Sequence, residues 1–290
     1  MKDMDSLLEE LKQALEDFDT DRCMALIGKL SNRATEMDPL ILIVTALLEV
    51  GQPREALHRI QELEKLGTSA PGYDEELAEI LRHRKVEALY LTGDPQSALA
   101  LTLSLEPADP LEEADREFFI GLCHDHLGDP ESADEHFAKA TELDPDGNPP
   151  IPTISSEEAH ELVATVLGEL PEKILKEMEE VPIILEDLPE LAMIQESAGQ
   201  ISPDTLGLYS GSTVANDSQG GFSPQEGMPT TAVIRIYRRN LERMSRNKKN
   251  LVEQVKITLL HEIGHHLGLD EEDVDRLGLD EEDVDRLGLA

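Results

Sequence analysis

The sequence predicts a multidomain protein in which an all-α helical repeat domain precedes a small α+β domain. Apolar residues recur at helical spacings from Ser6 to about Leu143, with glycine and proline between the segments. Beyond residue 180 the pattern changes to short apolar runs, which are typical of β-strands. A cluster of proline, glycine and asparagine between the two patterns indicates a linker. The predicted boundaries are 1–146 for the repeats, 147–155 for the linker, 156–279 for the second domain and 280–290 for an acidic tail.

One helix–turn–helix signature recurs along the first domain. Its copies are Gly51-Gln52-Pro53, Gly93-Asp94-Pro95 and Gly128-Asp129-Pro130, and an alanine follows each of them three residues after the proline. Glycine permits the positive φ that ends one helix, and proline suits the first turn of the next. We therefore expect helical hairpins that stack and share an apolar core.

The last copy resembles a tetratricopeptide repeat. The matching positions carry small, aromatic and terminating residues, namely Gly121, Gly128, Ala133, Phe137, Ala140 and Pro145. The earlier copies are degenerate, since Thr102 occupies the position that matches Phe137. The resemblance implies a concave surface for protein or peptide partners, and the alternative is a scaffold that only supports the second domain.

The second domain is expected to combine helices, short strands and one long loop. The helices are predicted over Ser156–Glu179 and from Asn250, which has capping-box character with Glu253, to Leu267 before Gly268. Strands are predicted within Val181–Leu188, at Leu206–Tyr209 and at Ala232–Tyr237. The stretch Ser210–Thr231 has loop composition, and we expect it to be mobile.

The last predicted helix carries the sequence His261-Glu262-Ile263-Gly264-His265. A four-residue spacing places both imidazoles on one helix face, where they can share a metal ion. Glu262 is one residue further round, so its carboxylate can act as a general base rather than as a ligand. The pattern predicts a zinc site where a metal-activated water attacks a peptide carbonyl and Glu262 passes the proton to the leaving amine.

A third ligand is expected just after the turn at Gly268. Glu271 is the first choice, and Asp270 and Asp273 remain alternatives because a turn of unknown shape can present any of these carboxylates. The spacing resembles the metzincin pattern with a carboxylate in place of the third histidine. Three protein ligands leave a fourth position open, which is the arrangement of a catalytic zinc.

The stretch from about Ser155 to Leu279 resembles the minimal-zincin family of bacterial metallopeptidases, which often occur with tetratricopeptide repeats. The runs that carry this resemblance are Val181–Pro189, Leu206–Tyr209, Tyr237–Leu241 and Thr258–Leu269. The resemblance implies a zinc site on a compact zincin-like core. It also implies a zinc metallopeptidase that acts on a protein or peptide substrate, with repeats that recruit protein partners or substrates.

Two other functions fit the same residues. In one, the chain is a non-enzymatic protein-binding adaptor whose zinc is structural. In the other, the activated water attacks a carbonyl that is not part of a peptide. Glu262 favours an enzyme over the adaptor, because a structural zinc needs no glutamate beside a bound water.

Several residues near the motif have two interpretations each. His266 is predicted to be partly buried or to support the ligands, and Tyr237 to pack in the core rather than assist an oxyanion. Zincins bind substrate along an edge strand, and Ala232–Tyr237 is the predicted strand. The basic segment Arg235–Lys249 is predicted to balance acidic groups of the same chain, the alternative being attraction of an acidic substrate.

Composition narrows the partners and the location. Asp and Glu number 62 against 25 Lys and Arg, and the formal charge of −37 repels nucleic acid and anionic lipid. The chain start lacks a basic and apolar leader, and the longest apolar run, Pro39 to Val50, is too short to cross a bilayer. Cys23 and Cys123 lack metal-ligand spacing and are expected to be buried thiols. We therefore expect a soluble cytoplasmic protein without nucleic-acid or membrane partners.

The C-terminal sequence is a direct duplication. Gly268–Leu277 recurs identically as Gly278–Leu287, and only the first copy has ligand spacing relative to the histidines. Its carboxylates lack the central glycine and ligand alternation of an EF-hand loop. The second copy is predicted to be an appended acidic helix or tail.

Overall fold

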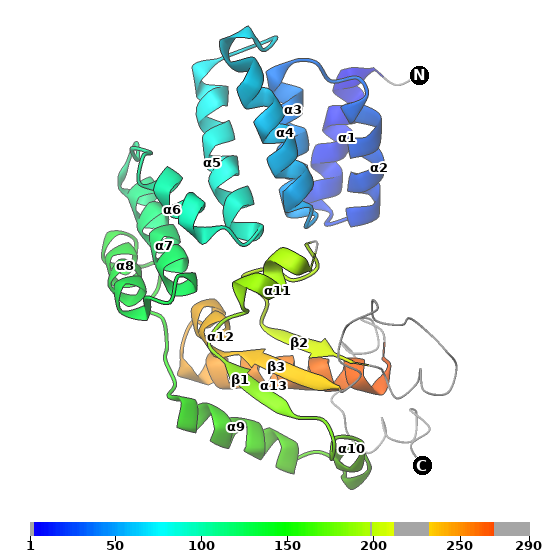
Figure 1. Cartoon of the computed structure of the whole chain (residues 1–290), viewed down its shortest axis with the longest axis vertical. Helices are drawn as coiled ribbons and strands as arrows, with labels where there is room; N and C mark the ends of the chain where they lie inside the picture. The colour runs from blue at the N-terminus through cyan, green and yellow to red at the C-terminus, as the bar shows by residue number, and fades with distance from the viewer. Residues whose placement is uncertain (1–2, 198, 212–231, 270–290) are drawn as a thin grey trace. The chain divides into compact units, whose positions relative to one another are not determined.

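The computed structural model describes residues 3–197, 199–211 and 232–269, and it divides the chain into two compact units (Figure 1). Unit 1 consists of Met1–Asn148 and Glu190–Pro203, and unit 2 of Pro149–Pro189 and Asp204–Ala290. The chain therefore passes from one unit to the other at residues 148/149, 189/190 and 203/204. Among the described residues, no helix is both long and apolar enough to span a membrane.

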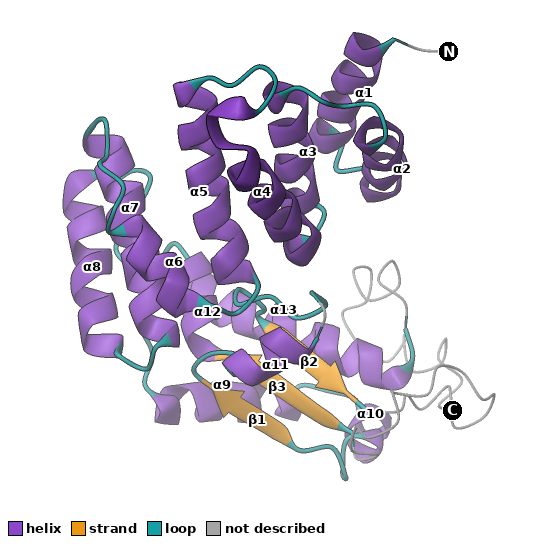
Figure 2. Cartoon of the chain, turned by 45° about the horizontal axis from the view of Figure 1, so that its top comes forward, coloured by secondary structure: helices purple, strands orange, loops and turns teal. Residues whose placement is uncertain are grey.

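Unit 1 is built from helices throughout its described part, which confirms the predicted helical N-terminal region (Figure 2). The tetratricopeptide assignment of its hairpins stays a prediction. The helices are α1 (Met4–Glu16), α2 (Thr20–Ser31), α3 (Met37–Glu49), α4 (Pro53–Leu66), η1 (Gly67–Ser69), α5 (Glu75–Leu91), α6 (Pro95–Thr102), α7 (Pro110–His126), α8 (Pro130–Leu143) and α11 (Leu191–Glu196).

The recurring turn has the predicted backbone. Gly51, Gly93 and Gly128 have φ values of 73°, 80° and 80°, and the prolines two positions later open α4, α6 and α8. In the second and third copies the intervening aspartate also caps the next helix, with Asp94 accepting the Ser97 amide at 3.0 Å. Gln52 makes no such bond in the first copy. Each residue of the Gly-Asp-Pro turn thus has a separate structural task.

The hairpin of α7 and α8 depends on small residues at the helix contact. Ala133 and Ala140 are fully buried, and a Cβ atom on Gly121 would lie only 2.6 Å from a ring carbon of Phe137. The glycine therefore makes room for the phenylalanine ring. In the preceding hairpin the matching residue, Thr102, is buried and bonds the Ala98 carbonyl.

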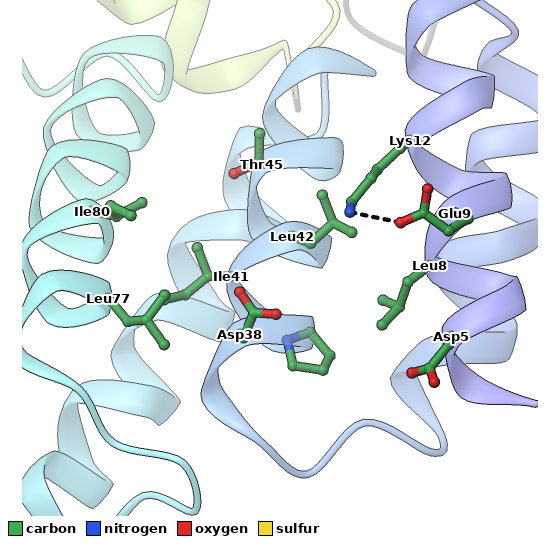
Figure 3. A pocket seen from close by; sticks show the side chains of 11 residues that line it. Asp5, Leu8, Glu9, Lys12, Asp38, Ile41, Leu42, Thr45, Leu77 and Ile80 are labelled. Carbon is green, nitrogen blue, oxygen red and sulfur yellow. Dashed lines mark hydrogen bonds and ion pairs between the residues drawn. The ribbon is translucent and has the colours of Figure 1, made fainter.

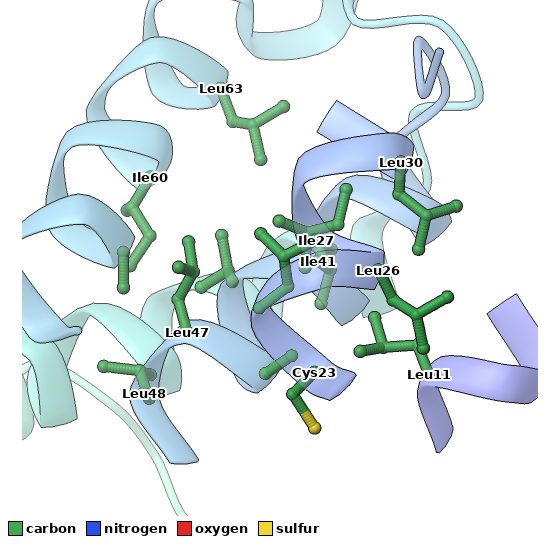
Figure 4. Packing of buried hydrophobic residues seen from close by; sticks show 14 of the residues in the cluster. Leu11, Cys23, Leu26, Ile27, Leu30, Ile41, Leu47, Leu48, Ile60 and Leu63 are labelled. Atoms are coloured by element: carbon green, nitrogen blue, oxygen red, sulfur yellow. The ribbon is translucent and has the colours of Figure 1, made fainter. Parts of the chain in front are cut away.

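Two apolar clusters stabilise unit 1. The larger joins α1 to α5, and Figure 4 shows Leu11, Ile27, Ile41 and Ile60 from four successive helices within it. Cys23 belongs to this cluster, while Cys123 belongs to the smaller one around Tyr90 and Leu99. Both cysteines are buried and free, as predicted.

A segment from far along the chain completes unit 1. The side chain of Ile194 in α11 is only 2% exposed, and the Gln195 side chain donates to the Gly93 carbonyl at 2.6 Å. Arg54 donates in turn to the Gln195 carbonyl. A Cβ atom on Gly199 would lie 3.4 Å from the Gly51 carbonyl oxygen. The described residues 190–197 and 199–203, here called the insert, therefore contact the first two of the three recurring turns.

Unit 2 contains the predicted strands and helices with two corrections. The helix predicted over Ser156–Glu179 is in fact two helices, because the ring of Pro171 cannot continue a helix. The last helix is capped by Asn247, whose side chain accepts the Asn250 amide, so Asn250 is not the cap. The elements are α9 (Ser156–Gly168), α10 (Glu172–Glu177), β1 (Ile183–Glu186), β2 (Gly207–Ser210), β3 (Val233–Tyr237), α12 (Arg238–Met244) and α13 (Lys248–Leu267).

The three described strands form a mixed sheet in the order β1-β3-β2. β1 pairs with β3 in parallel, with Ile183 opposite Ile234, and β2 pairs antiparallel, with Tyr209 opposite Ile234. The prediction that Ala232–Tyr237 forms the edge strand is therefore wrong, because β3 lies between its two neighbours. Strand order depends on long-range pairing, which the local pattern of one strand does not encode.

Helix α13 packs against β2 and β3 and supplies much of the core of unit 2. Ile234 and Ile236 of β3 are fully buried and share this core with Leu259 and Ile263 of α13. Because side chains alternate along a strand, Arg235 points to the opposite face, where it meets Ser210 at 3.2 Å. The packing of β2 and β3 on α13 fixes the sheet relative to the predicted zinc motif.

Candidate metal centre

The imidazoles of His261 and His265 face each other on α13. Their Nε2 atoms lie 2.9 Å apart and their ring centroids 4.5 Å apart, with the ring planes at 87°. Both side chains are half-buried. The predicted four-residue spacing thus brings two nitrogen atoms to one point at the helix surface.

The helix holds this pair by anchoring the turns around it. Leu259 and Ile263 alternate with the histidines and are fully buried in the core of unit 2. Gly268 ends the helix with φ 88°, and the Gly268 and Leu269 amides donate to the last helical carbonyls, as the glycine predicts. The metal motif therefore lies in the final turns of a helix whose opposite side is fixed.

Glu262 lies between α13 and β2. Its side chain is 6% exposed, and one carboxylate oxygen accepts the Tyr209 backbone amide at 2.6 Å. A Cβ atom on Gly207 would lie 2.7 Å from the other carboxylate oxygen and equally close to the methyl group of Thr258. Gly207 therefore permits the close approach of α13 to the strand, and the strand in turn orients the carboxylate.

The backbone N–H group of Tyr209 points away from β3. Leu206 accepts a hydrogen bond from the Tyr237 amide, so the backbone groups of residues 206 and 208 point toward β3. The groups of Gly207 and Tyr209 point to the other side by alternation, and no described strand pairs there. The edge strand next to the histidine pair is therefore β2.

His266 is buried beside the same strand, as predicted. Its Nε2 lies 3.3 Å from the Glu177 carbonyl oxygen and its Nδ1 lies 3.2 Å from the hydroxyl oxygen of Tyr209. A carbonyl can only accept, so Nε2 carries the proton and Nδ1 accepts the tyrosine O–H. Burial lowers the pKa of His266, which keeps the ring neutral even though the Glu177 hydrogen bond acts in the opposite direction.

The donor atoms of the site suit a zinc ion. Neutral imidazole nitrogens are common zinc ligands, and two of them on one tetrahedral zinc lie about 3.3 Å apart. The observed 2.9 Å between the Nε2 atoms of His261 and His265 needs only a small outward rotation of the rings to reach that spacing. Within the described part of the chain, no third His, Cys, Asp or Glu joins the pair. Glu271, Asp270 and Asp273 lie outside the described residues.

Two other predictions concern residues around the site. Tyr237 is fully buried, which confirms its packing role. The basic segment makes ion pairs inside unit 2: Arg238 contacts Asp187 and Glu242 at 2.6 Å each, and Lys248 contacts Glu158 at 2.6 Å. These contacts confirm the predicted balancing of acidic groups for part of the segment. The predicted mobile loop falls mainly on residues 212–231, outside the described residues.

Sequence reasoning missed three residues of the site. Gly207 and Tyr209 were recognised as part of a strand and of the family resemblance but were given no role at the site, and the carbonyl of Glu177 was not considered. A glycine inside an apolar strand is the one available signal, since it often marks close approach of another group. The hydrogen bonds of Tyr209 carry no sequence signal, because they depend on the position of β2 beside α13.

Comparison with known proteins gives one match, to a family model. A search among curated proteins finds no match to the chain. Residues 178–287 match the family model described as zincin-like metallopeptidase, and this range includes the histidine pair, Glu262, β2 and the insert. This part of the chain is therefore similar to zincin-like metallopeptidases.

Proposed function

We propose that the chain is a zinc-dependent metallopeptidase with its active centre on α13. His261 and His265 would hold the zinc ion, with Glu271, or alternatively Asp270 or Asp273, as the third ligand. The observation that supports this most directly is the convergence of the two Nε2 atoms, 2.9 Å apart, next to a buried carboxylate. The family match over residues 178–287 supports the same reaction class.

Glu262 is the general base in this proposal. When bound, zinc lowers the pKa of a water molecule and polarises the scissile carbonyl. Glu262 takes the proton from the attacking water and gives it to the leaving amine. Its hydrogen bond from the Tyr209 amide keeps the carboxylate in one orientation, so little reorganisation is needed during the reaction.

The substrate strand would lie along β2. The outward side of this strand presents the amide and carbonyl groups of Gly207 and Tyr209 close to Glu262. An extended peptide can pair with such an edge through backbone hydrogen bonds. Because the Tyr209 amide is already bound by Glu262, a peptide carbonyl at this position would share that donor with the base.

The helical unit would recruit protein partners or substrates. Its hairpins share the turn, and the alanine that follows each turn is fully buried, namely Ala56, Ala98 and Ala133. Stacked hairpins commonly use an extended surface for protein binding. This role adds to the peptidase proposal and is independent of the chemistry on α13.

The peptidase proposal is tested by Glu262→Gln. We expect the variant to keep its zinc, measured by elemental analysis, and to lose cleavage of an unstructured protein such as casein by about 10²–10⁴-fold. Glu253→Gln changes an exposed glutamate on the same helix and should leave both properties unchanged. Zinc in all three proteins without cleavage by wild type would favour the adaptor or a hydrolase of another carbonyl. Absence of zinc from wild type would overturn the metal site.

A further inference from the structure

Three helices of unit 1 line an open pocket of about 410 Å³. Its walls come from α1, α3 and α5, which are every second helix of the first hairpins. Figure 3 shows Leu42 and Ile41 of α3 between Leu8 of α1 and Leu77 of α5. The pocket therefore lies along one side of the stacked hairpins, on the surface that the first helix of each pair provides.

The floor of this pocket is apolar and only partly covered. Leu8, Leu42 and Leu77 are half-buried, and Ile80 is 39% exposed. Beneath them Ile41 is buried and belongs to the larger core of the unit. An apolar side chain placed here would remove the remaining surface of these leucines from water. The floor suits one branched aliphatic side chain of a ligand.

The rim of the pocket is acidic. Asp5, Glu9 and Asp38 line it with exposed side chains, and Lys12 is the one cation among the described residues of the lining. The Lys12 ammonium already pairs with Glu9 at 2.8 Å. The hydrogen bond and charge of Glu9, and to a smaller extent the charge of Asp38, raise the pKa of Lys12. The rim retains an excess of negative charge after this pairing.

Charge decides which macromolecule fits. A second copy of the chain would bring a formal charge of −37 toward an acidic rim, and the two would repel each other. A segment rich in lysine and arginine would be attracted to the same rim. The acidic residues of the rim come from two helices, α1 and α3. To reach both, the bound segment must be extended, with basic residues before and after its apolar side chain.

We propose that this pocket docks an extended basic segment of a protein substrate, with one leucine-like side chain on Leu8, Leu42 and Leu77. Lysine or arginine side chains on either side of it meet Asp5, Glu9 and Asp38. The proposal rests on the proposed peptidase function only where it calls the bound protein a substrate. Docking itself requires neither zinc nor Glu262.

The test is a binding measurement that does not depend on cleavage. The probe is a fluorescent peptide with a central leucine between two pairs of lysines, and the protein is the full chain carrying Glu262→Ala. Matched peptides carry glutamates in place of the lysines, or alanine in place of the leucine. We expect the lysine–leucine peptide to bind most tightly and its affinity to fall as salt is added, because exposed charges are screened.

Paired variants locate the binding site. Neutralising the rim with Asp5→Asn, Glu9→Gln and Asp38→Asn should weaken binding about tenfold, since each exposed pair contributes modestly. The control neutralises three exposed glutamates on α8, with Glu131→Gln, Glu135→Gln and Glu142→Gln, which changes the net charge equally. It should change affinity less than twofold, because none of these glutamates lines the pocket. Leu42→Ala should also weaken binding, with circular dichroism showing that the helices remain.

Several outcomes would overturn the proposal. These are no binding of the lysine–leucine peptide, equal binding of the lysine and glutamate peptides, or equal effects of the rim and α8 variants. Sedimentation that shows a dimer lost on Leu42→Ala would assign the pocket to a second copy instead. If peptide binding follows the expected pattern while wild type cleaves nothing, docking is supported and the peptidase proposal fails separately.

Discussion

At the scale of single residues, Tyr209 connects the predicted base to a buried histidine. Its backbone amide donates to Glu262 at 2.6 Å, and its hydroxyl group lies 3.2 Å from Nδ1 of His266. The Glu177 carbonyl fixes the tautomer of that histidine. Tyr209 of β2 thus makes hydrogen bonds to two residues of α13, Glu262 through its backbone and His266 through its side chain.

The Tyr209–His266 hydrogen bond is measurable by a double-mutant cycle. Tyr209→Phe should lower the free energy of unfolding by about 1 kcal/mol, because Nδ1 of His266 loses its donor while buried. With His266→Asn as the second variant, urea denaturation should give a coupling energy of about 0.5–1.5 kcal/mol. Strictly additive effects would show that the two groups do not interact.

Gly207 offers a direct test of how β2 positions the base. A Cβ atom there would lie 2.7 Å from a Glu262 oxygen, so Gly207→Ala should displace the carboxylate. We expect the rate of casein cleavage to fall at least tenfold, of the order seen when a positioned catalytic group is misplaced. Zinc content should stay the same, because the atoms nearest to the added Cβ belong to Glu262 and Thr258 and not to the histidines. Gly168→Ala, where the added methyl group meets open space, is the control.

At the scale of secondary-structure elements, the insert gives the turn at Gly93 different neighbours from the turn at Gly128. Ile194 and Gln195 of α11 lie against Gly93, whereas a Cβ atom on Gly128 would meet nothing within 4 Å. The two glycines have the same φ of 80°. The same turn thus serves as a connection in one hairpin and as a docking surface in another.

These two glycines form a matched pair for measuring the docking of α11. Gly93→Ala and Gly128→Ala should each cost about 1 kcal/mol of backbone strain. Only Gly93→Ala also pushes on Gln195 and Ile194, 3.0 and 3.2 Å from the added Cβ. We expect amide hydrogen exchange over residues 190–197 and 199–203 to accelerate in that variant alone. Equal protection in both variants would contradict the docking contact.

The elements themselves were largely predictable, but their partners were not. Periodicity located the helical N-terminal region, the Gly-x-Pro turns located the starts of α4, α6 and α8, and the short apolar runs located all three described strands. The edge role was assigned to the wrong strand, since pairing order is a property of the whole sheet. The insert was missed because the apolar pattern of Leu191 to Ile194 is equally compatible with either core. The spacing of the two histidines was predictable because it lies within one helix.

At the scale of the whole molecule, the two cysteines report on separate parts of unit 1. Cys23 lies in the larger apolar cluster and Cys123 in the smaller one. Burial raises the pKa of both thiols, that of Cys123 to about 12. Since the thiolate is the reactive form, neither should react in the folded chain.

Thiol labelling can therefore show whether unit 1 opens as one body. With Ellman's reagent at about pH 8, we expect negligible reaction until the unit unfolds in denaturant. Cys23→Ser and Cys123→Ser variants assign each rate to one cluster. Equal denaturant dependence of both rates would indicate a single cooperative unit, and rapid labelling of either thiol without denaturant would contradict the buried packing.

The insert also limits where recombination can divide such a chain. Its residues stand in sequence between β1 and β2 of unit 2, yet their side chains complete unit 1. A recombination break at Asn148 would supply the downstream half with a helix that lacks its binding surface, and the upstream half with turns left uncovered. Neither compact unit can therefore be exchanged as one continuous piece of sequence. A recombination event between relatives keeps both units intact only if residues on both sides of Asn148 are transferred together.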